Sequence, residues 1–277
     1  MKYYLVTGAY GGMGYATTKL LASMGNTVFA LDLNLGEPIE NVIPIKVDIT
    51  DAESVKTAFE KVKSYTDKLY AIIHFAGVYM LDSLVEIPDS EWDKIFKVNL
   101  YGAYNVNKYF LPLLNNGSRI IITTSELAPL DPLPFTGIYA ITKSALDKYS
   151  YSLRMELQLK DVQVSVIRAG AVSTGMLGAS TTALDKFCEK TRLYQFSADK
   201  FRNIVLRVES KCVSPQKIAK KVVRVLRLKK TKFAYKINRN KLLLLLNFLP
   251  TRLQFYAIRK ILKNSKSSNL TEGGVKG

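Results

Sequence analysis

Histidine and cysteine are scarce in this sequence of 277 residues, which contains one histidine, His74, and two cysteines, Cys188 and Cys212. Two cysteines are too few for a disulfide framework, and they lack the paired spacing of metal ligands. A single histidine excludes the usual His-rich zinc sites and a Ser-His-Asp triad that uses a second histidine. We therefore expect neither a disulfide framework nor a metal site.

Long uncharged stretches are missing as well. The longest in the basic C-terminal part, Leu242–Thr251, has ten residues, whereas a membrane-spanning helix needs about 20. No signal peptide is predicted, because Met1-Lys2 leads directly into the apolar run Tyr3–Val6 and a glycine-rich turn. These absences predict a cytoplasmic protein.

Acidic residues are scarce in only one part of the chain. Residues 200–277 carry 21 Lys+Arg and 2 Asp+Glu, whereas residues 1–199 carry 19 Lys+Arg and 21 Asp+Glu, so the formal net charge of +17 resides in the C-terminal quarter. A nucleic-acid partner is not predicted, since the basic segment has no aromatic platform and no base-reading motif. A hydrophobic content of 48% excludes compositional disorder and provides for a large core.

Short β-branched runs alternate with longer helical periods, as a parallel sheet covered by helices requires. We predict one α/β domain over residues 1–237, a Rossmann-type doubly wound parallel sheet with a substrate lid at about 175–215. A basic, leucine-rich helical extension follows at 238–277, and its end, Ser265–Gly277, is predicted to be disordered. The predicted strands are Tyr3–Val6, Thr27–Leu31, Val42–Val47, Ala71–His74, Arg119–Thr124, Val162–Ile167 and Phe233–Ile237, and the predicted helices are Gly14–Met24, Asp51–Tyr65, Asp89–Tyr109, Tyr139–Leu159 and Ala183–Leu206.

A glycine-rich turn, Thr7-Gly8-Ala9-Tyr10-Gly11-Gly12-Met13-Gly14, joins the first predicted strand to the first helix. Glycines at this place let backbone N–H groups and the positive helix N-terminus approach a pyrophosphate. Asp32 ends the second strand 18 positions beyond Gly14, where a carboxylate binds the adenosine ribose hydroxyls and repels a 2′-phosphate. Because Thr7–Thr18 and Leu33–Ile45 contain no Arg or Lys, the sequence favours NAD(H) over NADP(H).

Tyr139 and Lys143 are four residues apart, which places a phenol and an ammonium group on one face of a helix. The ordinary pKa of a phenol is about 10, too high for a good base at neutral pH, and a neighbouring cation lowers it. Ser125 ends an apolar strand 14 residues upstream, at the carboxyl edge of the sheet. This combination predicts acid–base chemistry at a substrate oxygen.

Together with Asp48, Ala76-Gly77, Asn99 and Gly170–Thr174, these motifs resemble the short-chain dehydrogenase/reductase family, in its shorter branch rather than the epimerase-like one. The matching residues occur in the family's order and spacing over about residues 3–175. The family is one of oxidoreductases that use a nicotinamide dinucleotide. The resemblance therefore implies hydride transfer between a carbinol or ketone carbon and NAD(H).

The resemblance also implies a role for each matching residue. Tyr139 exchanges a proton with the substrate oxygen, Ser125 positions that oxygen, and Lys143 lowers the pKa of Tyr139 and holds the nicotinamide ribose. Asn99 anchors a water relay to Lys143. The cofactor-binding residues implied, beside Tyr139 and Lys143, are Asp48 at the adenine, Thr174 at the carboxamide, and Gly8, Tyr10, Gly12, Met13, Gly14, Asp32, Ile49, Ala76, Gly77, Gly170 and Val172.

Three positions depart from the family pattern. His74 stands where the family has the first Asn of Asn-Asn-Ala-Gly, and we interpret it as a structural substitute, with a tuning role as the alternative. Ala169-Gly170 replaces the usual Pro-Gly before the nicotinamide loop, which predicts a less rigid loop. Glu126 directly follows Ser125; it either supports a loop through a salt bridge, which we favour, or faces the pocket.

Apolar segments are predicted to determine the substrate. The loop Leu127–Phe135 is apolar and rich in proline, and few fixed charges suit a bulky lipophilic alcohol or ketone. The segment 235–250 resembles steroid and retinol dehydrogenases of the family, so a hydroxysteroid, bile acids included, is the leading hypothesis. The predicted lid contributes aromatic and leucine side chains that either line this pocket or only pack the lid: Phe187, Leu193, Tyr194, Phe196 and Phe201.

Two other functions stay open. One is a general carbonyl, retinol or 3-ketoacyl reductase of the same family. The other is a dinucleotide-sensing binding protein without turnover. The second is disfavoured, because Asn99, Ser125, Tyr139 and Lys143 are all retained.

The basic C-terminal segment contains two amphipathic stretches, Lys217–Lys232 and Lys241–Lys263, and Pro250 divides the second into two short helices. We predict that it packs, as a pocket lid or as an oligomer contact in a homodimer or homotetramer. The alternative is a peripheral contact with an anionic membrane, which suits a lipophilic substrate.

Overall fold

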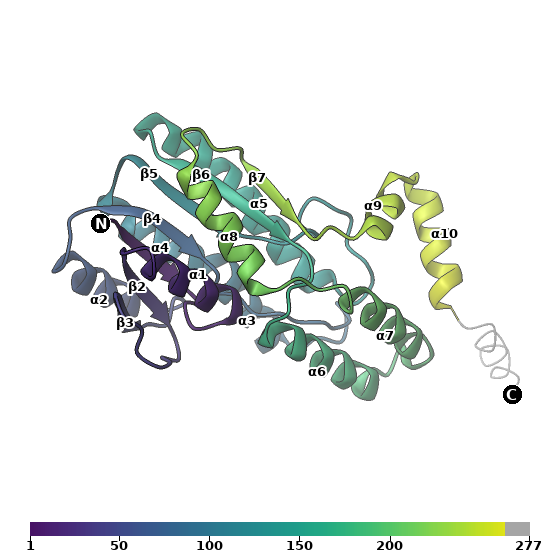
Figure 1. The fold of residues 1–277 in the computed structure, drawn as a ribbon. Coiled ribbons are helices and arrows are strands. Elements are labelled where there is room, and N and C mark those ends of the chain that lie inside the picture. Colours follow the sequence, from purple (N-terminus) through teal and green to yellow (C-terminus); the bar gives the residue numbers. More distant parts are fainter. Residues whose placement is uncertain (264–277) are drawn as a thin grey trace, which may run out of the picture.

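The computed structural model describes residues 1–263, with the side chains at positions 177, 179, 208 and 209 left aside; the predicted disordered end, Ser265–Gly277, lies outside them. Seven parallel strands form one sheet in the order β3-β2-β1-β4-β5-β6-β7. The predicted Rossmann-type fold is therefore confirmed (Figure 1). The strands are β1 (Tyr3–Thr7), β2 (Thr27–Asp32), β3 (Val42–Lys46), β4 (Leu69–His74), β5 (Leu114–Thr123), β6 (Gln163–Ala169) and β7 (Ala234–Ile237).

Helices cover both faces of this sheet and continue beyond it. They are α1 (Gly12–Ala22), α2 (Ala52–Lys63), α3 (Asp89–Phe96), the π-helical turn η1 (Lys97–Tyr101), α4 (Gly102–Phe110), the 3-10 turn η2 (Leu111–Leu113), α5 (Gly137–Leu157), the 3-10 turn η3 (Gln158–Lys160), α6 (Gly175–Lys190), α7 (Gln195–Glu209), α8 (Pro215–Arg227), α9 (Lys241–Phe248) and α10 (Thr251–Leu262).

Side chains of the central strands alternate between two apolar layers. Leu5 and Ile72 lie in the layer that contains α2, α4 and α5, whereas Val6 and Ile73 lie in the layer that contains α1 and α8. This double burial explains the nearly continuous apolar runs of the strands. Figure 1 shows α1 and α8 side by side across one face of the sheet.

The predicted single helix over Ala183–Leu206 is wrong, because this stretch belongs to two helices, α6 and α7. The break between them is explained by Glu86, whose carboxylate accepts hydrogen bonds from the Thr191 hydroxyl at 2.7 Å, the Arg192 N–H at 2.7 Å and the Leu193 N–H at 3.2 Å. Backbone donors that bond a carboxylate cannot continue the helix. A contact across more than a hundred residues thus sets a local boundary.

A buried ion pair fixes α5 against the sheet. The Asp147 carboxylate on α5 accepts two hydrogen bonds from the Arg168 guanidinium of β6, at 3.0 and 2.7 Å, and one from the Thr124 hydroxyl, at 3.1 Å. A paired, hydrogen-bonded charge is tolerated in a core, whereas removal of one partner is costly. The pair therefore holds the N-terminal half of α5 over the carboxyl ends of β5 and β6.

Candidate active site

At three glycines of the turn after β1, the backbone lies so close to neighbouring atoms that a side chain would not fit. Gly8 has φ +64°, and a Cβ there would lie 2.6 Å from the Ala76 nitrogen. A Cβ at Gly12 would lie 2.5 Å from Thr174, and one at Gly14 would lie 1.9 Å from the Gly8 oxygen. The turn leads directly into the N-terminus of α1. A glycine cradle before a helix N-terminus fits a dinucleotide pyrophosphate.

Asp32 lies at the end of β2, beside this cradle. Its carboxylate accepts the Tyr10 N–H at 2.9 Å and the Asn34 N–H at 3.3 Å. The Tyr10 ring packs against Gly36, so Tyr10 orients Asp32 through its backbone. Within the described residues, the Tyr10 side chain does not line the cleft.

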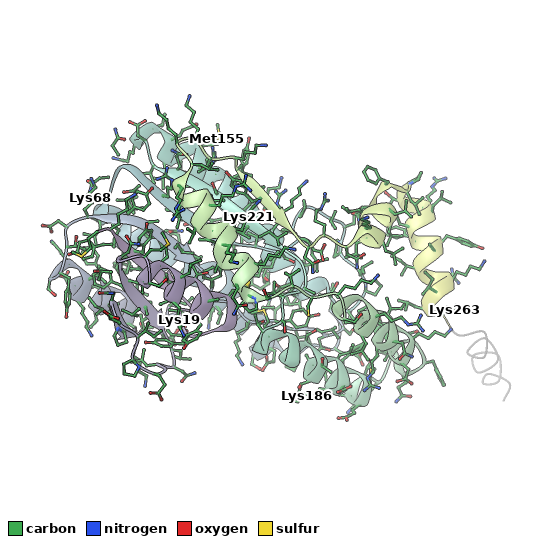
Figure 2. All side chains as sticks on the ribbon, viewed as in Figure 1. Lys19, Lys68, Met155, Lys186, Lys221 and Lys263 are labelled. Carbon is green, nitrogen blue, oxygen red and sulfur yellow. The ribbon has the colours of Figure 1, made fainter. Side chains whose placement is uncertain are left out.

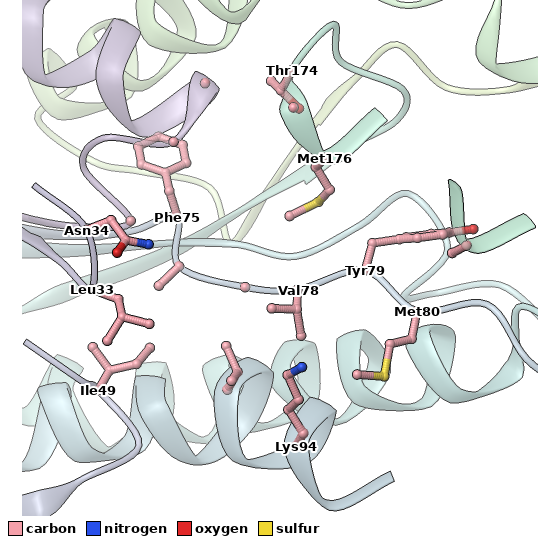
Figure 3. A pocket seen from close by; sticks show the side chains of 18 of the residues that line it. Leu33, Asn34, Ile49, Phe75, Val78, Tyr79, Met80, Lys94, Thr174 and Met176 are labelled. Carbon is pink, nitrogen blue, oxygen red and sulfur yellow. The ribbon is translucent and has the colours of Figure 1, made fainter. Parts of the chain in front are cut away.

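The cradle opens into a cleft of about 1130 Å³ along the carboxyl edge of the sheet. Figure 3 shows Leu33 and Ile49 at one end of it and Thr174 and Met176 on the opposite side. Asp48 is oriented by Thr50, whose N–H and hydroxyl it accepts at 2.8 and 2.7 Å. Ten of the predicted cofactor-binding residues line this cleft: Gly8, Gly12, Met13, Gly14, Asp32, Asp48, Ile49, Ala76, Gly77 and Thr174.

Tyr139 and Lys143 lie on the first two turns of α5, one helical turn apart as predicted from their spacing, and both are buried. The Ser125 side chain hydrogen-bonds the Tyr139 phenol, and the Tyr79 ring packs on the Tyr139 ring with a centroid distance of 4.8 Å. Burial raises the pKa of the Tyr139 phenol, Tyr79 raises it further, and the Ser125 hydrogen bond opposes this shift. The phenol is therefore held in its protonated form in this environment.

Lys143 is the nearby cation that can stabilise a phenolate. Its Nζ lies 5.7 Å from the centre of the Tyr139 ring and donates to the Thr123 carbonyl at 3.4 Å. Burial lowers the pKa of Lys143 to about 8, which still leaves the ammonium form dominant at neutral pH. A Cβ at Gly77 would lie 3.3 Å from the same Nζ, so this glycine keeps the lysine close to the cleft.

Asn99 lies on the π-helical turn η1, within a stretch that we predicted as an uninterrupted helix from Asp89 to Tyr109. Its Oδ1 accepts the Val78 N–H at 2.8 Å, and its Nδ2 donates to the Val78 carbonyl at 2.9 Å and to the Thr142 hydroxyl at 3.2 Å. Asn99 therefore braces the segment after β4 against α5. Its role in a water relay to Lys143 stays a prediction.

His74 ends β4 in a buried polar chain. One ring nitrogen, Nε2, lies 2.9 Å from Asn107 Oδ1, and Asn107 Nδ2 donates to the Tyr149 hydroxyl at 3.1 Å. Burial lowers the pKa of His74 to about 4, and the Asn107 hydrogen bond opposes this only in part. A neutral imidazole that links β4 to α4 and α5 agrees with the interpretation of His74 as a structural substitute.

A second cavity, of about 390 Å³, is lined by Ser125 and Tyr139 and adjoins the cleft. Met13, Tyr79, Thr174 and Met176 line both spaces, so the two meet at these four residues, and Tyr79 packs on the Tyr139 ring. Gly170 and Val172, which we predicted as cofactor-binding residues, line this second cavity and not the cleft within the described residues. Its remaining walls are largely apolar and come from the loop before α5, from α7, and from α9 and α10.

The predicted lid supplies less of this lining than the sequence indicated. Among the five predicted side chains, only Phe201 lines the second cavity, while Phe187 lines the cleft. Phe187, Tyr194 and Phe201 surround the Phe135 ring with centroid distances of 4.6, 5.0 and 5.2 Å. Leu193 and Phe196 are exposed. Tyr194 therefore only packs the lid, whereas Phe187 and Phe201 both pack it and line one of the two spaces.

The extension supplies the wall that sequence reasoning assigned to the lid. Leu242, Leu243, Leu245, Leu246 and Leu249 of α9 and its C-terminal end line the second cavity, with Ile258, Ile261 and Leu262 of α10. The leucine-rich composition was the available signal, but its position over the catalytic residues depends on distant contacts. The side chains of the extension thus lie where a pocket lid would place them, while its role as a lid or an oligomer contact stays a prediction.

Glu126 joins this wall to the catalytic serine. The Glu126 carboxylate lines the second cavity and accepts the Asn240 N–H at 2.6 Å, where α9 begins. Burial raises the pKa of Glu126, while the Asn240 hydrogen bond and the charge of Arg239 oppose this. Both interpretations of Glu126 are thus partly right: it faces the pocket and supports a loop, although through a backbone N–H instead of a salt bridge.

The parallel sheet, the glycine cradle and the buried Ser125, Tyr139 and Lys143 define an oxidoreductase of the Rossmann type that binds a nicotinamide dinucleotide. The family model of short chain dehydrogenases matches residues 2–185. The chain therefore belongs to the short-chain dehydrogenase family, which confirms the predicted family and enzyme class.

Several relatives locate the chain within this family. It is 37% identical over 210 residues to estradiol 17-beta-dehydrogenase 2 from Mus musculus, which covers 72% of this chain and 55% of the mouse protein. It is 26% identical over 262 residues to 3-ketodihydrosphingosine reductase from Bacteroides thetaiotaomicron, which covers 92% and 96% of the two chains. The chain thus spans little more than half the length of the mouse relative.

Solved structures agree with the fold. A short-chain dehydrogenase/reductase from Burkholderia phymatum, in complex with NAD, superposes with a TM-score of 0.71 at 21% identity and covers 84% of this chain and 88% of its own. At this identity the likeness concerns the fold.

Proposed function

We propose that the protein uses NAD(H) to interconvert a secondary alcohol and a ketone on a bulky lipophilic substrate, with a hydroxysteroid, bile acids included, as the leading candidate. The observation that carries this proposal is the apolar cavity of about 390 Å³ that is lined by Ser125 and Tyr139 and adjoins the dinucleotide cleft. Pockets of this size and lining bind drug-sized apolar ligands, and a few polar groups fix their orientation. Here those polar groups are the two hydroxyls.

In the proposed reaction, a bound nicotinamide supplies the acceptor or donor of the hydride. Ser125 donates a hydrogen bond to the substrate oxygen and so orients the reacting carbon. Tyr139 takes the hydroxyl proton on its phenol oxygen during oxidation and returns it during reduction. The Lys143 ammonium group, 5.7 Å from the centre of the Tyr139 ring, favours the phenolate by Coulomb attraction and so acts against the burial that keeps Tyr139 protonated.

The preference for NAD(H) over NADP(H) rests on the Asp32 carboxylate. Its two oxygens are held at the mouth of the glycine cradle by Tyr10 and Asn34 N–H groups. In this position they can accept the two ribose hydroxyls and repel a 2′-phosphate. Residues 33–45 contain no Arg or Lys, so this loop has no cation that could bind the 2′-phosphate and offset the repulsion by Asp32.

A second substrate class is favoured by one specific observation. The match to 3-ketodihydrosphingosine reductase covers 92% of this chain, so it reaches into the extension that walls the cavity. The match to the mouse estradiol 17-beta-dehydrogenase 2 has the higher identity but covers less of the chain. A keto group on a long-chain lipid is therefore the alternative to a hydroxysteroid.

Initial rates of NADH formation or consumption test the proposal. The panel contains hydroxysteroids and bile acids, 3-ketodihydrosphingosine, a retinoid, an acyl thioester, and a sugar alcohol as the small polar control. We expect turnover of the bulky apolar members and a loss of about 10² to 10⁴ in kcat for Tyr139→Phe. NADH binding by the variant should change by less than about threefold, because the phenylalanine ring keeps the packing and the glycine cradle and Lys143 are intact.

Activity confined to small or sugar-like substrates would overturn the proposed substrate class. Equal rates for Tyr139→Phe and the parent protein would overturn the catalytic assignment. Tight NADH binding without turnover of any panel member would favour the dinucleotide-sensing alternative.

A further inference from the structure

The extension leaves its apolar side chains uncovered. Among the described residues of α9 and α10, the only buried side chain is that of Gln254. Phe248, Phe255 and Tyr256 are 84%, 68% and 64% exposed, and they do not line the cavity. Figure 1 shows the two helices at one end of the molecule, beyond the sheet. Several large exposed apolar side chains on one pair of helices indicate a binding surface.

The same helices carry positive charge without acidic residues. No Asp or Glu occurs between positions 210 and 271. Basic residues alternate along these helices with the exposed aromatics and aliphatics; those in the described part are Arg239, Lys241, Arg252, Arg259, Lys260 and Lys263. Figure 2 shows side chains standing out around this helix pair, with Lys263 at the end of α10. Helices that expose apolar side chains and carry only positive charge complement an anionic, partly apolar partner.

Polar contacts fix which side of the extension faces outward. Asn240 begins α9 and is bound by the Glu126 carboxylate. The Asp131 N–H donates to Asn247 Oδ1 at 2.7 Å, and Gln254 Nε2 donates to Asp131 Oδ2 at 3.4 Å. These contacts attach one side of both helices to the segment around Ser125, so Phe248 and Phe255 remain free on the surface.

We propose that α9 and α10 dock the protein on the surface of an anionic lipid bilayer. Each aromatic side chain that enters the interface removes apolar area from water, and each nearby Lys or Arg contributes about 1 kcal/mol of attraction to anionic lipid. Within residues 1–263, no helix combines the length and the apolar character needed to cross a bilayer.

A second copy of the chain fits this surface less well. A two-fold interface would bring the same patch of each protomer together. Two acid-free basic patches would then repel each other. Anionic lipid headgroups instead neutralise the basic residues while the acyl region receives the aromatics, so lipid satisfies both features of the surface.

The docking surface lies beside the cavity mouth. Leu242, Leu245 and Ile261 line the cavity and are also more than half exposed. A docked bilayer would therefore lie next to the entrance, and an apolar substrate could pass from lipid to Tyr139 with little exposure to water. This consequence alone rests on the proposed function; the docking itself does not require turnover.

Co-sedimentation of the full-length protein with vesicles tests the docking. One set of vesicles contains phosphatidylglycerol in phosphatidylcholine and the other contains phosphatidylcholine alone. We expect binding to the anionic set, weakened by salt. Phe248→Asp combined with Phe255→Asp should lower the partition coefficient more than tenfold, and Arg252→Gln, Arg259→Gln and Lys260→Gln together should lower it about a hundredfold.

The matched control is Leu159→Asp on η3, because Leu159 is 84% exposed, as Phe248 is. It should bind vesicles like the parent protein, and circular dichroism should show that all variants are folded. Wild-type protein that stays in the supernatant with anionic vesicles would overturn the proposal. Vesicle binding unchanged by the aromatic variants would do so too, and so would a sedimentation-detected dimer that those variants dissociate without any vesicle binding.

Discussion

Helix α8 and the pair α9–α10 consist of the same two kinds of residue, basic and aliphatic, and both lie in the acid-poor C-terminal quarter. In α8, the apolar side chains pack against α1 and the sheet, so Ile218 and Val222 are fully buried. In α9 and α10, the apolar side chains line a cavity or face solvent. Composition alone does not distinguish a core helix from a helix that faces a cavity. The difference lies in whether the apolar face of the helix packs against the sheet or against an open space.

The dinucleotide cleft and the second cavity differ in the same way. The dinucleotide cleft is built from residues within the first 190 positions, whereas the second cavity needs the extension. We therefore propose that chemistry and cofactor binding depend on the core and that the choice of substrate depends on the extension. The predictions below separate these contributions, beginning with the largest expected effect.

An aspartate in α8 should lower the free energy of unfolding strongly, whereas an aspartate in α10 should hardly change it. Val222→Asp in α8 buries an unpaired charge, so we expect a loss of roughly 4 kcal/mol or more in the free energy of unfolding. Leu253→Asp in α10, where Leu253 is 51% exposed, should change it by less than about 0.5 kcal/mol. Denaturant unfolding of both variants measures this. Similar losses would show that the extension belongs to the cooperative core.

The core should also dominate the pH dependence of stability through His74. In the folded protein its pKa is about 4 instead of 6.5, so the unfolded chain holds more protons between these values. Stability then falls as the pH drops through this window, by about 3 kcal/mol for this group. His74→Asn should flatten the profile by that amount relative to the parent protein, and parallel profiles would contradict the assignment. Urea midpoints measured over this pH range provide the test.

Asp32→Asn should alter the preference between NADH and NADPH and should leave the binding of the lipophilic substrate unchanged. The variant keeps an acceptor for the Tyr10 N–H but loses the charge. We expect about tenfold weaker NADH binding and tighter NADPH binding, since charge-assisted hydrogen bonds are lost together with the repulsion. Fluorescence titration with both cofactors measures the ratio. Equal affinity of the parent protein for NADH and NADPH would contradict the role of Asp32.

Glu126→Ala tests the junction between the two regions and should have the smallest effect. Removal of the acceptor leaves the Asn240 N–H unpaired at the start of α9, which should raise the KM for the lipophilic substrate about fivefold. Glu126→Gln retains an acceptor oxygen and should restore the KM. The KM for NAD+ should not change in either variant. A drop in kcat alone would instead place Glu126 at the reacting atoms.

The parts of the site that the sequence predicts are those encoded in short local patterns. The glycine turn and the acidic end of β2 line the cleft, and Tyr139 and Lys143 lie on adjacent turns of α5, because parallel-strand geometry and helix periodicity determine where they lie. Asn99 was predicted through the family pattern. The π-helical turn that brings it to Val78 and Thr142 has no signal in the local sequence.

The remaining parts depend on distant pairings. Glu126 meets Asn240 across 114 positions, and Glu86 ends α6 from more than 100 positions away. Tyr79 packs on Tyr139 from the segment after β4. Such contacts have no sequence period, so the wall formed by α9 and α10 could be predicted as a lid but not located over Ser125.

The most direct test asks whether a side chain of the extension changes the turnover of a bulky substrate. Leu246 of α9 lines the substrate cavity and lies outside the dinucleotide cleft. We predict that Leu246→Asn lowers kcat/KM about tenfold for a hydroxysteroid, through lost apolar contact, and leaves kcat/KM for a small secondary alcohol and the KM for NAD+ unchanged. Equal losses for both alcohols, or no loss for the steroid, would contradict the claim that the extension selects the substrate.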